Sequence, residues 1–81
     1  MKFHYVYILR STVDRDRFYV GLTQNLEQRL NQHNQGDTLN TKSLAPWQIE
    51  TATAFRDSTK AIAFEKYLKS HSGRAFAKRH Y

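Results

Sequence analysis

Cysteine is absent from the 81-residue sequence. Without it, the chain can build neither a disulfide framework nor a thiolate metal site. Its four histidines, His4, His33, His71 and His80, are scattered and lack the paired spacing of zinc ligands. We therefore expect neither disulfide cross-links nor a structural zinc site.

Long apolar runs, internal repeats, low-complexity tracts and interdomain linkers are missing as well. No stretch approaches the ~20 apolar residues that cross a bilayer, and no signal-peptide pattern opens the chain. A chain of 81 residues is expected to form one domain, residues 1–81, with a modest core and marginal stability. We expect a soluble, cytoplasmic protein that does not bind membranes.

Acidic side chains are scarce in the last quarter of the sequence. Residues 60–81 contain six lysines and arginines but a single acid, Glu65, which gives them net +5 of the total +6. A concentrated basic segment suits a polyanion, most often nucleic acid, although a solvated helix face can be equally basic. The candidate nucleic-acid contacts are Lys66, Lys69, Arg74, Lys78 and Arg79.

Three segments have the pattern of β-strands. Residues 2–10, KFHYVYILR, carry apolar groups on both faces, which is typical of a central strand. Residues 17–23, RFYVGLT, predict a second strand, and the short charged stretch between the two indicates an antiparallel hairpin. Residues 47–55, WQIETATAF, alternate with the period of a third strand.

The segment after the second strand predicts a helix. Thr23 or Asn25 can cap its start, and Gly36 can supply the left-handed residue that ends it. Residues 36–46, GDTLNTKSLAP, lack periodicity and are rich in turn formers. We expect a long, mobile loop there.

Two further helices are expected after the third strand. The first runs from residue 58 or 59 to about His71, and Ser72 and Gly73 break it. Residues 74–81 add a short basic helix. The order ββαβαα predicts an α/β sandwich in which helices flank a small three-stranded, mostly antiparallel sheet.

The first predicted helix carries a cation and an imidazole beside its apolar stripe. Leu26 and Leu30 define the stripe, and at ~100° per residue His33 lies about 20° from Leu26 and Arg29 about 60° from it. Arg29 and His33 are therefore neighbours, one turn apart, that border the core. Packing can explain both, because arginine stems often lie along apolar surface and half-buried histidines are ordinary.

The second predicted helix carries a carboxylate within its apolar stripe. Ala61, Phe64 and Leu68 form the stripe, and Glu65 lies about 40° from Ala61 by the helical period. A carboxylate there is costly unless a cation, a metal ion or hydrogen bonds satisfy it. An ion pair with Lys69, four residues later, is the structural alternative to a metal.

Two tyrosines fall on the expected hairpin. A suitable register brings the phenols of Tyr7 and Tyr19 close together, and Gly21 leaves space on the same face as Tyr19. Tyrosines in strands usually serve packing. Two phenols, Arg29, His33 and a carboxylate that all face inward from different elements nevertheless indicate a shared site.

In their order and spacing, these residues resemble the motifs of GIY-YIG nuclease domains. The matching segments are YVY at 5–7, YVG at 19–21, RLNQHN at 29–34 and Glu65 within AIAFEKYLK. The resemblance spans nearly the whole chain. It looks most like the small stand-alone bacterial members, which share the Pro46–Trp47 pair and the ending at 65–75, and it extends to the N-terminal domain of the C subunit of the excision-repair nuclease.

The resemblance implies a divalent-metal-dependent endonuclease that hydrolyses DNA phosphodiester bonds. The roles it implies are DNA repair or recombination, and RNA is the alternative substrate. Glu65 matches the family glutamate that holds Mg²⁺ or Mn²⁺, and a hard cation can take its other ligands from water and substrate. Arg29 matches an arginine whose fork of donors stabilises charge on the phosphate. Tyr7 matches the tyrosine proposed to activate water, and Tyr19 and His33 match groups that relay the proton or orient the water. Which group takes the proton stays open.

The chain departs from the family pattern at several places. Val6 and Val20 replace the isoleucines of the family name, and neither change alters the chemistry. Tyr5 stands where the family name has glycine, and no asparagine follows Asn40, whereas many members carry one after the glutamate. A second hypothesis is therefore a catalytically weak or inactive nucleic-acid-binding module that uses the basic C-terminal helices. A third is a structural adaptor that contacts a protein partner through Trp47, Phe55 and residues 36–46.

Overall fold

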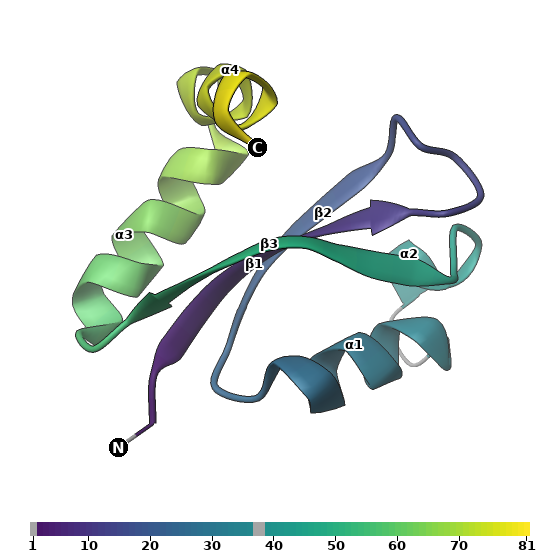
Figure 1. Cartoon of the computed structure of the whole chain (residues 1–81), viewed down its shortest axis with the longest axis horizontal. Coiled ribbons are helices and arrows are strands. Elements are labelled where there is room, and N and C mark those ends of the chain that lie inside the picture. Colours follow the sequence, from purple (N-terminus) through teal and green to yellow (C-terminus); the bar gives the residue numbers. More distant parts are fainter. Residues whose placement is uncertain (1, 37–38) are drawn as a thin grey trace.

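The computed structural model describes residues 2–36 and 39–81 of the chain (Figure 1). Its middle layer is a three-stranded sheet built from β1 (His4–Ser11), β2 (Phe18–Thr23) and β3 (Trp47–Phe55), in the order β2-β1-β3. Both neighbouring pairs are antiparallel. The first strand is central, as its apolar groups on both faces predicted.

Helices cover both faces of this sheet (Figure 1). Helix α1 (Leu26–Asn34) packs on one face, and α3 (Ser58–Lys69) packs on the other and is followed by α4 (His71–His80). The predicted ββαβαα sandwich is confirmed, with one addition. Residues 36–46 were expected to be loop throughout, but α2 (Leu39–Lys42) forms one helical turn there, and residues 37 and 38 lie outside the described residues. None of the helices in the described part of the chain is long and apolar enough to cross a membrane.

Alternation along β1 creates two small cores, one on each face of the sheet. Their seven buried apolar side chains are at most 4 % exposed: Tyr7, Leu9 and Trp47 on the α1 side, and Val6, Ile8, Ala61 and Leu68 on the α3 side. Helix α1 completes the first core with Leu26 and Leu30. Both faces of the central strand are therefore needed to bury enough apolar area in so short a chain.

Local signals place α1 where the sequence predicted it. Asn25 is the N-cap, and its side chain accepts a hydrogen bond from the backbone N–H of Gln28 at 3.0 Å. Gly36 adopts φ 81°, the left-handed conformation expected after the helix. Near the end of the helix, the Asn34 side-chain amide bonds both the backbone N–H and the carbonyl of Trp47. Asn34 thereby joins the helix to the first residue of β3.

The junction between α3 and α4 differs from the prediction. Ser72 and Gly73 were expected to break the helix, but the break is at Ser70, and both residues lie in the first turn of α4. Ser70 ends α3 and caps α4, because its hydroxyl accepts a hydrogen bond from the Gly73 N–H at 3.0 Å. Gly73 instead allows α4 to approach the end of α3 closely, because a Cβ atom there would overlap the backbone carbonyl oxygen of Tyr67.

We expect Gly73→Ala to destabilise the fold by about 1–3 kcal/mol, because the added methyl group forces the two helices apart. The matched control is Ser72→Ala, an exposed neighbour in the same turn, which should stay within about 0.5 kcal/mol of the parent. Urea unfolding followed by circular dichroism measures both. Equal stability of parent and Gly73→Ala would show that the junction tolerates a side chain.

Candidate functional site

The hydroxyl of Tyr7 is the centre of a polar cluster on the α1 side of the sheet. Tyr7 is 1 % exposed, and its hydroxyl accepts a hydrogen bond from Arg29 Nε at 3.3 Å and lies 3.2 Å from His33 Nε2. Arg29 and His33 are one turn apart on α1, so packing of the helix brings both onto the phenol. The half-buried arginine and the fully buried histidine do border the core, as their helical positions predicted.

Strand register adds the second tyrosine to the cluster. Tyr7 is paired with Gly21 across β1 and β2, which leaves Tyr19 on the same face, diagonal to Tyr7. The rings of Tyr7 and Tyr19 are 6.3 Å apart between centroids, and Tyr19 lies 4.6 Å from the His33 ring. A Cβ atom on Gly21 would overlap the Tyr7 hydroxyl. Gly21 therefore provides the space in which the phenol lies.

Two further polar residues support the cluster from outside. Thr41 Oγ1 lies 2.9 Å from His33 Nδ1, and Gln32 Oε1 accepts a hydrogen bond from Arg29 at 3.0 Å. Thr41 is 1 % exposed, and its carbonyl accepts a hydrogen bond from the indole N–H of Trp47 at 2.8 Å. The sequence analysis missed Thr41, because it lies in the aperiodic segment 36–46. Gln32 was not among the site residues that the sequence predicted.

Burial controls the protonation of the two central groups. Burial raises the pKa of the Tyr7 phenol, and the hydrogen bond and charge of Arg29 partly oppose this rise. Burial also lowers the pKa of His33, and the positive charge of Arg29 adds to the effect. At neutral pH the phenol is therefore protonated and the imidazole is neutral. The tautomer of His33 decides whether its Nε2 accepts the Tyr7 proton or donates its own.

Glu65 lies on α3, outside the hydrogen bonds of this cluster. Its side chain is 19 % exposed, and Oε2 lies 2.7 Å from Lys69 Nζ, so the ion pair foreseen as the structural alternative is present. The negative charge of Glu65 contributes to the raised pKa of Tyr7, which places it within electrostatic reach of the phenol. Four of the five predicted site residues thus form one contact network, and the fifth acts on it through its charge.

A metal ion at Glu65 would depend on ligands beyond the protein's own side chains. Within residues 2–36 and 39–81, no three histidine, cysteine, aspartate or glutamate side chains gather closely enough to hold a metal ion. One carboxylate together with water and phosphate oxygens is a donor set that a hard divalent cation accepts. The surroundings of Glu65 therefore fit a hard divalent cation whose other ligands are water and phosphate oxygens, and do not fit a preformed protein cage.

The predicted nucleic-acid contacts are exposed residues of α3 and α4. Three of them line one groove beside the sheet, and two lie elsewhere on the same helices: Lys69, Arg74 and Lys78 in the first group, Lys66 and Arg79 in the second. Their role in binding nucleic acid stays a prediction.

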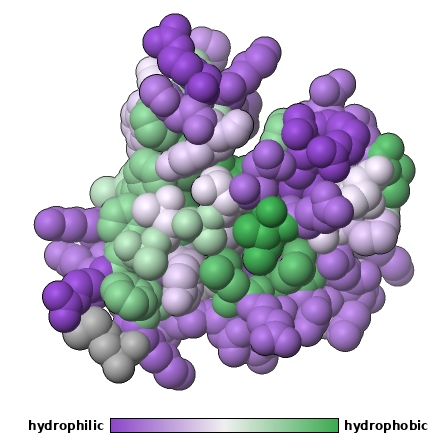
Figure 2. Space-filling model, in the orientation of Figure 1, coloured by the Kyte–Doolittle hydropathy of each residue, from purple (hydrophilic) through white to green (hydrophobic). Residues whose placement is uncertain are grey.

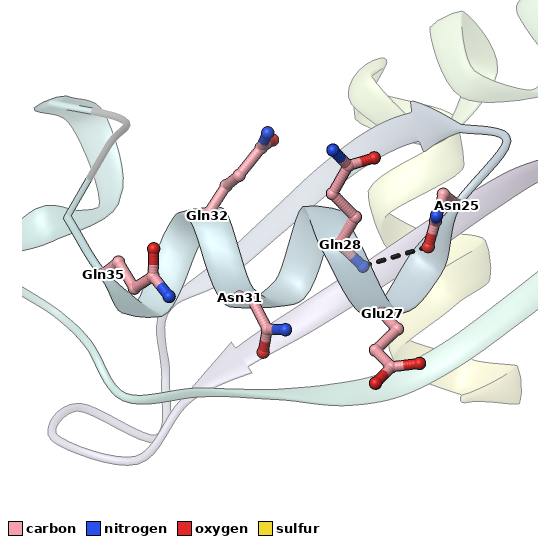
Figure 3. A pocket seen from close by; sticks show the side chains of 6 residues that line it. All are labelled: Asn25, Glu27, Gln28, Asn31, Gln32 and Gln35. Carbon is pink, nitrogen blue, oxygen red and sulfur yellow. Dashed lines mark hydrogen bonds between the residues drawn. The ribbon is translucent and has the colours of Figure 1, made fainter.

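The outer face of α1 bears a shallow pocket of about 460 Å³ that carries no site. It is lined by Asn25, Glu27, Gln28, Asn31, Gln32 and Gln35. Figure 3 shows that these side chains point in different directions and do not converge on a common point. Three of them, Glu27, Gln28 and Asn31, are exposed on the side of α1 away from the apolar stripe.

Most of this chain is similar in sequence to known proteins. The sequence model of the family described as GIY-YIG catalytic domain matches residues 3–80. A protein of Chaetomium globosum named structure-specific endonuclease subunit SLX1 is 46% identical over 71 residues, which are 80% of this chain and 22% of that protein. The protein of the same name from Podospora anserina is 44% identical over 66 residues, 74% of this chain and 19% of that protein. The chain thus spans about a fifth of the length of these curated relatives.

We expect the imidazole of His33 to titrate below the ordinary histidine pKa of ~6.5. The unfolded chain then takes up a proton at a higher pH than the folded chain, so the free energy of unfolding decreases as the pH falls below about 6.5. Above about pH 6.5, the neutral His33 imidazole causes no loss of stability. The His33 imidazole proton signal, assigned by its loss in His33→Asn, reports the midpoint by NMR. A midpoint at or above 6.5 would contradict the buried, neutral imidazole.

Proposed function

The chain belongs to the GIY-YIG catalytic domain family, and from this membership we propose that it is a divalent-metal-dependent endonuclease that hydrolyses DNA phosphodiester bonds. The strongest support is the buried contact of the Tyr7 hydroxyl with Arg29 and His33. Tyr7 comes from β1 and the other two residues from α1, and each matches a family motif. The relatives named as endonuclease subunits add support for phosphodiester cleavage.

The protein side chains supply proton transfer and charge stabilisation. Arg29 has five N–H donors, and after its bonds to Tyr7 and Gln32 it retains others for a phosphate oxygen. The same cation would stabilise a phenolate on Tyr7, because the developing charge lies within hydrogen-bond reach of the guanidinium. Neutral His33 is a suitable acceptor for the Tyr7 proton in the tautomer that protonates Nδ1 toward Thr41.

Glu65 is the residue proposed to hold the divalent metal ion. When bound, Mg²⁺ or Mn²⁺ polarises the phosphate and lowers the pKa of a water molecule. The Glu65 carboxylate already carries a cation, Lys69, which balances its charge while no substrate is bound. On substrate binding, Lys69 is free to turn toward a phosphate, because it is 52 % exposed. A role in DNA repair or recombination rests on the family resemblance.

A non-catalytic binding module remains the second candidate. The Glu65–Lys69 ion pair is complete without a metal, and no asparagine follows Asn40 in the sequence. The third hypothesis, a protein adaptor, loses one of its proposed contact residues. Trp47 is only 3 % exposed and packs in the core with Tyr7, so its indole is not available to a partner.

Plasmid and branched DNA should be nicked by the parent only when Mg²⁺ or Mn²⁺ is added. We expect Glu65→Gln to lower this rate by about two orders of magnitude or more, because the amide removes the anionic metal ligand. The matched control is Glu27→Gln on the solvated face of α1, which makes the same charge change and should cut at the parent's rate. Circular dichroism and thermal melting verify that both variants are folded.

Equal cutting by the parent and Glu65→Gln would place the active site elsewhere or reveal a contaminating nuclease. Salt-dependent binding of nucleic acid by the parent without metal-dependent products would favour the binding module. The same reactions with RNA of matching sequence decide the nucleic-acid class.

A further inference from the structure

A groove of about 850 Å³ separates the β1–β2 hairpin from α3 and α4. Figure 2 shows the surface hollowed between α4 and the end of the hairpin, with hydrophilic residues on both sides. Apolar side chains form part of its lining: Ile8, Val20, Leu68 and Ala77. The groove therefore combines an apolar surface with polar walls that come from opposite ends of the sequence.

The walls carry an excess of positive charge. Five cations line the groove, namely Arg10, Arg17, Lys69, Arg74 and Lys78, against the two acids Asp16 and Glu50. One acid is already matched, because Glu50 Oε2 lies 3.8 Å from the guanidinium of Arg10. The remaining charge suits a chain of phosphates.

Exposed aromatic rings lie among these cations. Phe18 at the start of β2 is 50 % exposed, and the Arg10 guanidinium carbon lies 4.8 Å from its ring centroid. Tyr81, at the end of α4, is 44 % exposed and packs edge-on against Phe76. Apolar rings that are held in place yet half exposed can stack on nucleobases, and stacking beside cations is how proteins bind single strands.

The groove lies on the α3 side of the sheet and shares one residue, Tyr19, with the polar cluster on the α1 side. Tyr19 lines the groove and also lies against the His33 ring. Lys69 lines it as well and pairs with Glu65. A strand lying in the groove would therefore contact Lys69, the ion-pair partner of the proposed metal ligand Glu65.

We propose that this groove binds an unpaired nucleic-acid strand, with a base stacked on Phe18 and phosphates contacted by Arg17, Arg74 and Lys78. The bases of a duplex cannot stack on the exposed aromatic rings, because they are already stacked on one another and their faces are covered. The inference builds on the proposed nuclease function, since it assigns to the substrate an unpaired segment beside the cut. Its chemistry is common to DNA and RNA strands.

Binding measured without metal tests the groove separately from catalysis. Fluorescence anisotropy in EDTA compares a short oligothymidine strand, a uridine strand of the same length and a blunt DNA duplex. We expect Phe18→Ala to weaken binding of the thymidine strand by roughly five- to a hundredfold, the range of base–aromatic stacking, and to leave duplex binding unchanged. Phe18→Leu, which keeps an apolar side chain but no aromatic face, should show the same selective loss.

The matched aromatic control is Phe3→Ala, because Phe3 is 37 % exposed and lies outside the groove. It should bind all three ligands as the parent does. For the charges, Lys78→Gln should reduce the salt slope of single-strand binding by about 0.7, the value for one phosphate contact. Lys60→Gln, an exposed lysine of α3 outside the groove, should leave that slope unchanged.

Three outcomes would overturn the groove assignment: unchanged strand binding by both Phe18 variants, an equal loss of duplex and strand binding, and no strand binding by the parent at low salt. Selective loss in a protein that never cuts would uphold the groove and refute the nuclease. Metal-dependent cutting with unchanged strand binding by the Phe18 variants would uphold the nuclease and refute the groove. Equal affinity for the thymidine and uridine strands supports recognition that does not depend on the sugar. Tighter binding of one strand identifies DNA or RNA as the substrate class.

Discussion

A buried phenol at the middle of the central strand constrains the rest of this domain. The Tyr7 hydroxyl lies where water is excluded, and an unsatisfied buried hydroxyl costs roughly 1–3 kcal/mol. Arg29 and His33 satisfy it only if α1 packs with these residues toward the sheet. The absence of a side chain on Gly21 is equally necessary, since any Cβ atom there would occupy the position of the hydroxyl.

The same network shows how a small fold accommodates polar side chains at the border of its core. An arginine and a histidine at the border of a modest core are less favourable for packing than two leucines would be. Each side chain is stabilised by a hydrogen-bonding partner. Gln32 accepts a hydrogen bond from Arg29, and the Thr41 hydroxyl lies beside Nδ1 of His33, the ring nitrogen that faces away from Tyr7. Burial in turn keeps the imidazole neutral, which a proton acceptor requires. Features that lower packing quality are thus the ones on which the proposed chemistry depends.

Much of the fold followed from local patterns in the sequence. Two-sided apolar alternation identified the central strand, and the Asn25 cap and Gly36 located α1 because both act within a few residues of themselves. The α3–α4 junction was misplaced for a related reason. Glycine is a common helix terminator, but at Gly73 it allows close approach to the Tyr67 carbonyl, a contact that no local pattern reveals.

The sequence by itself determined which residues face inward, because helical and strand periods follow from backbone geometry alone. It therefore identified Arg29, His33 and the two hairpin tyrosines as candidates for one site. Only the tertiary structure decided that Tyr7 is opposite Gly21, that Thr41 supports His33, and that the hairpin and α4 enclose a groove. These contacts join residues far apart in the chain, and they depend on strand register and helix packing, which are determined by the competition of all side chains for one core.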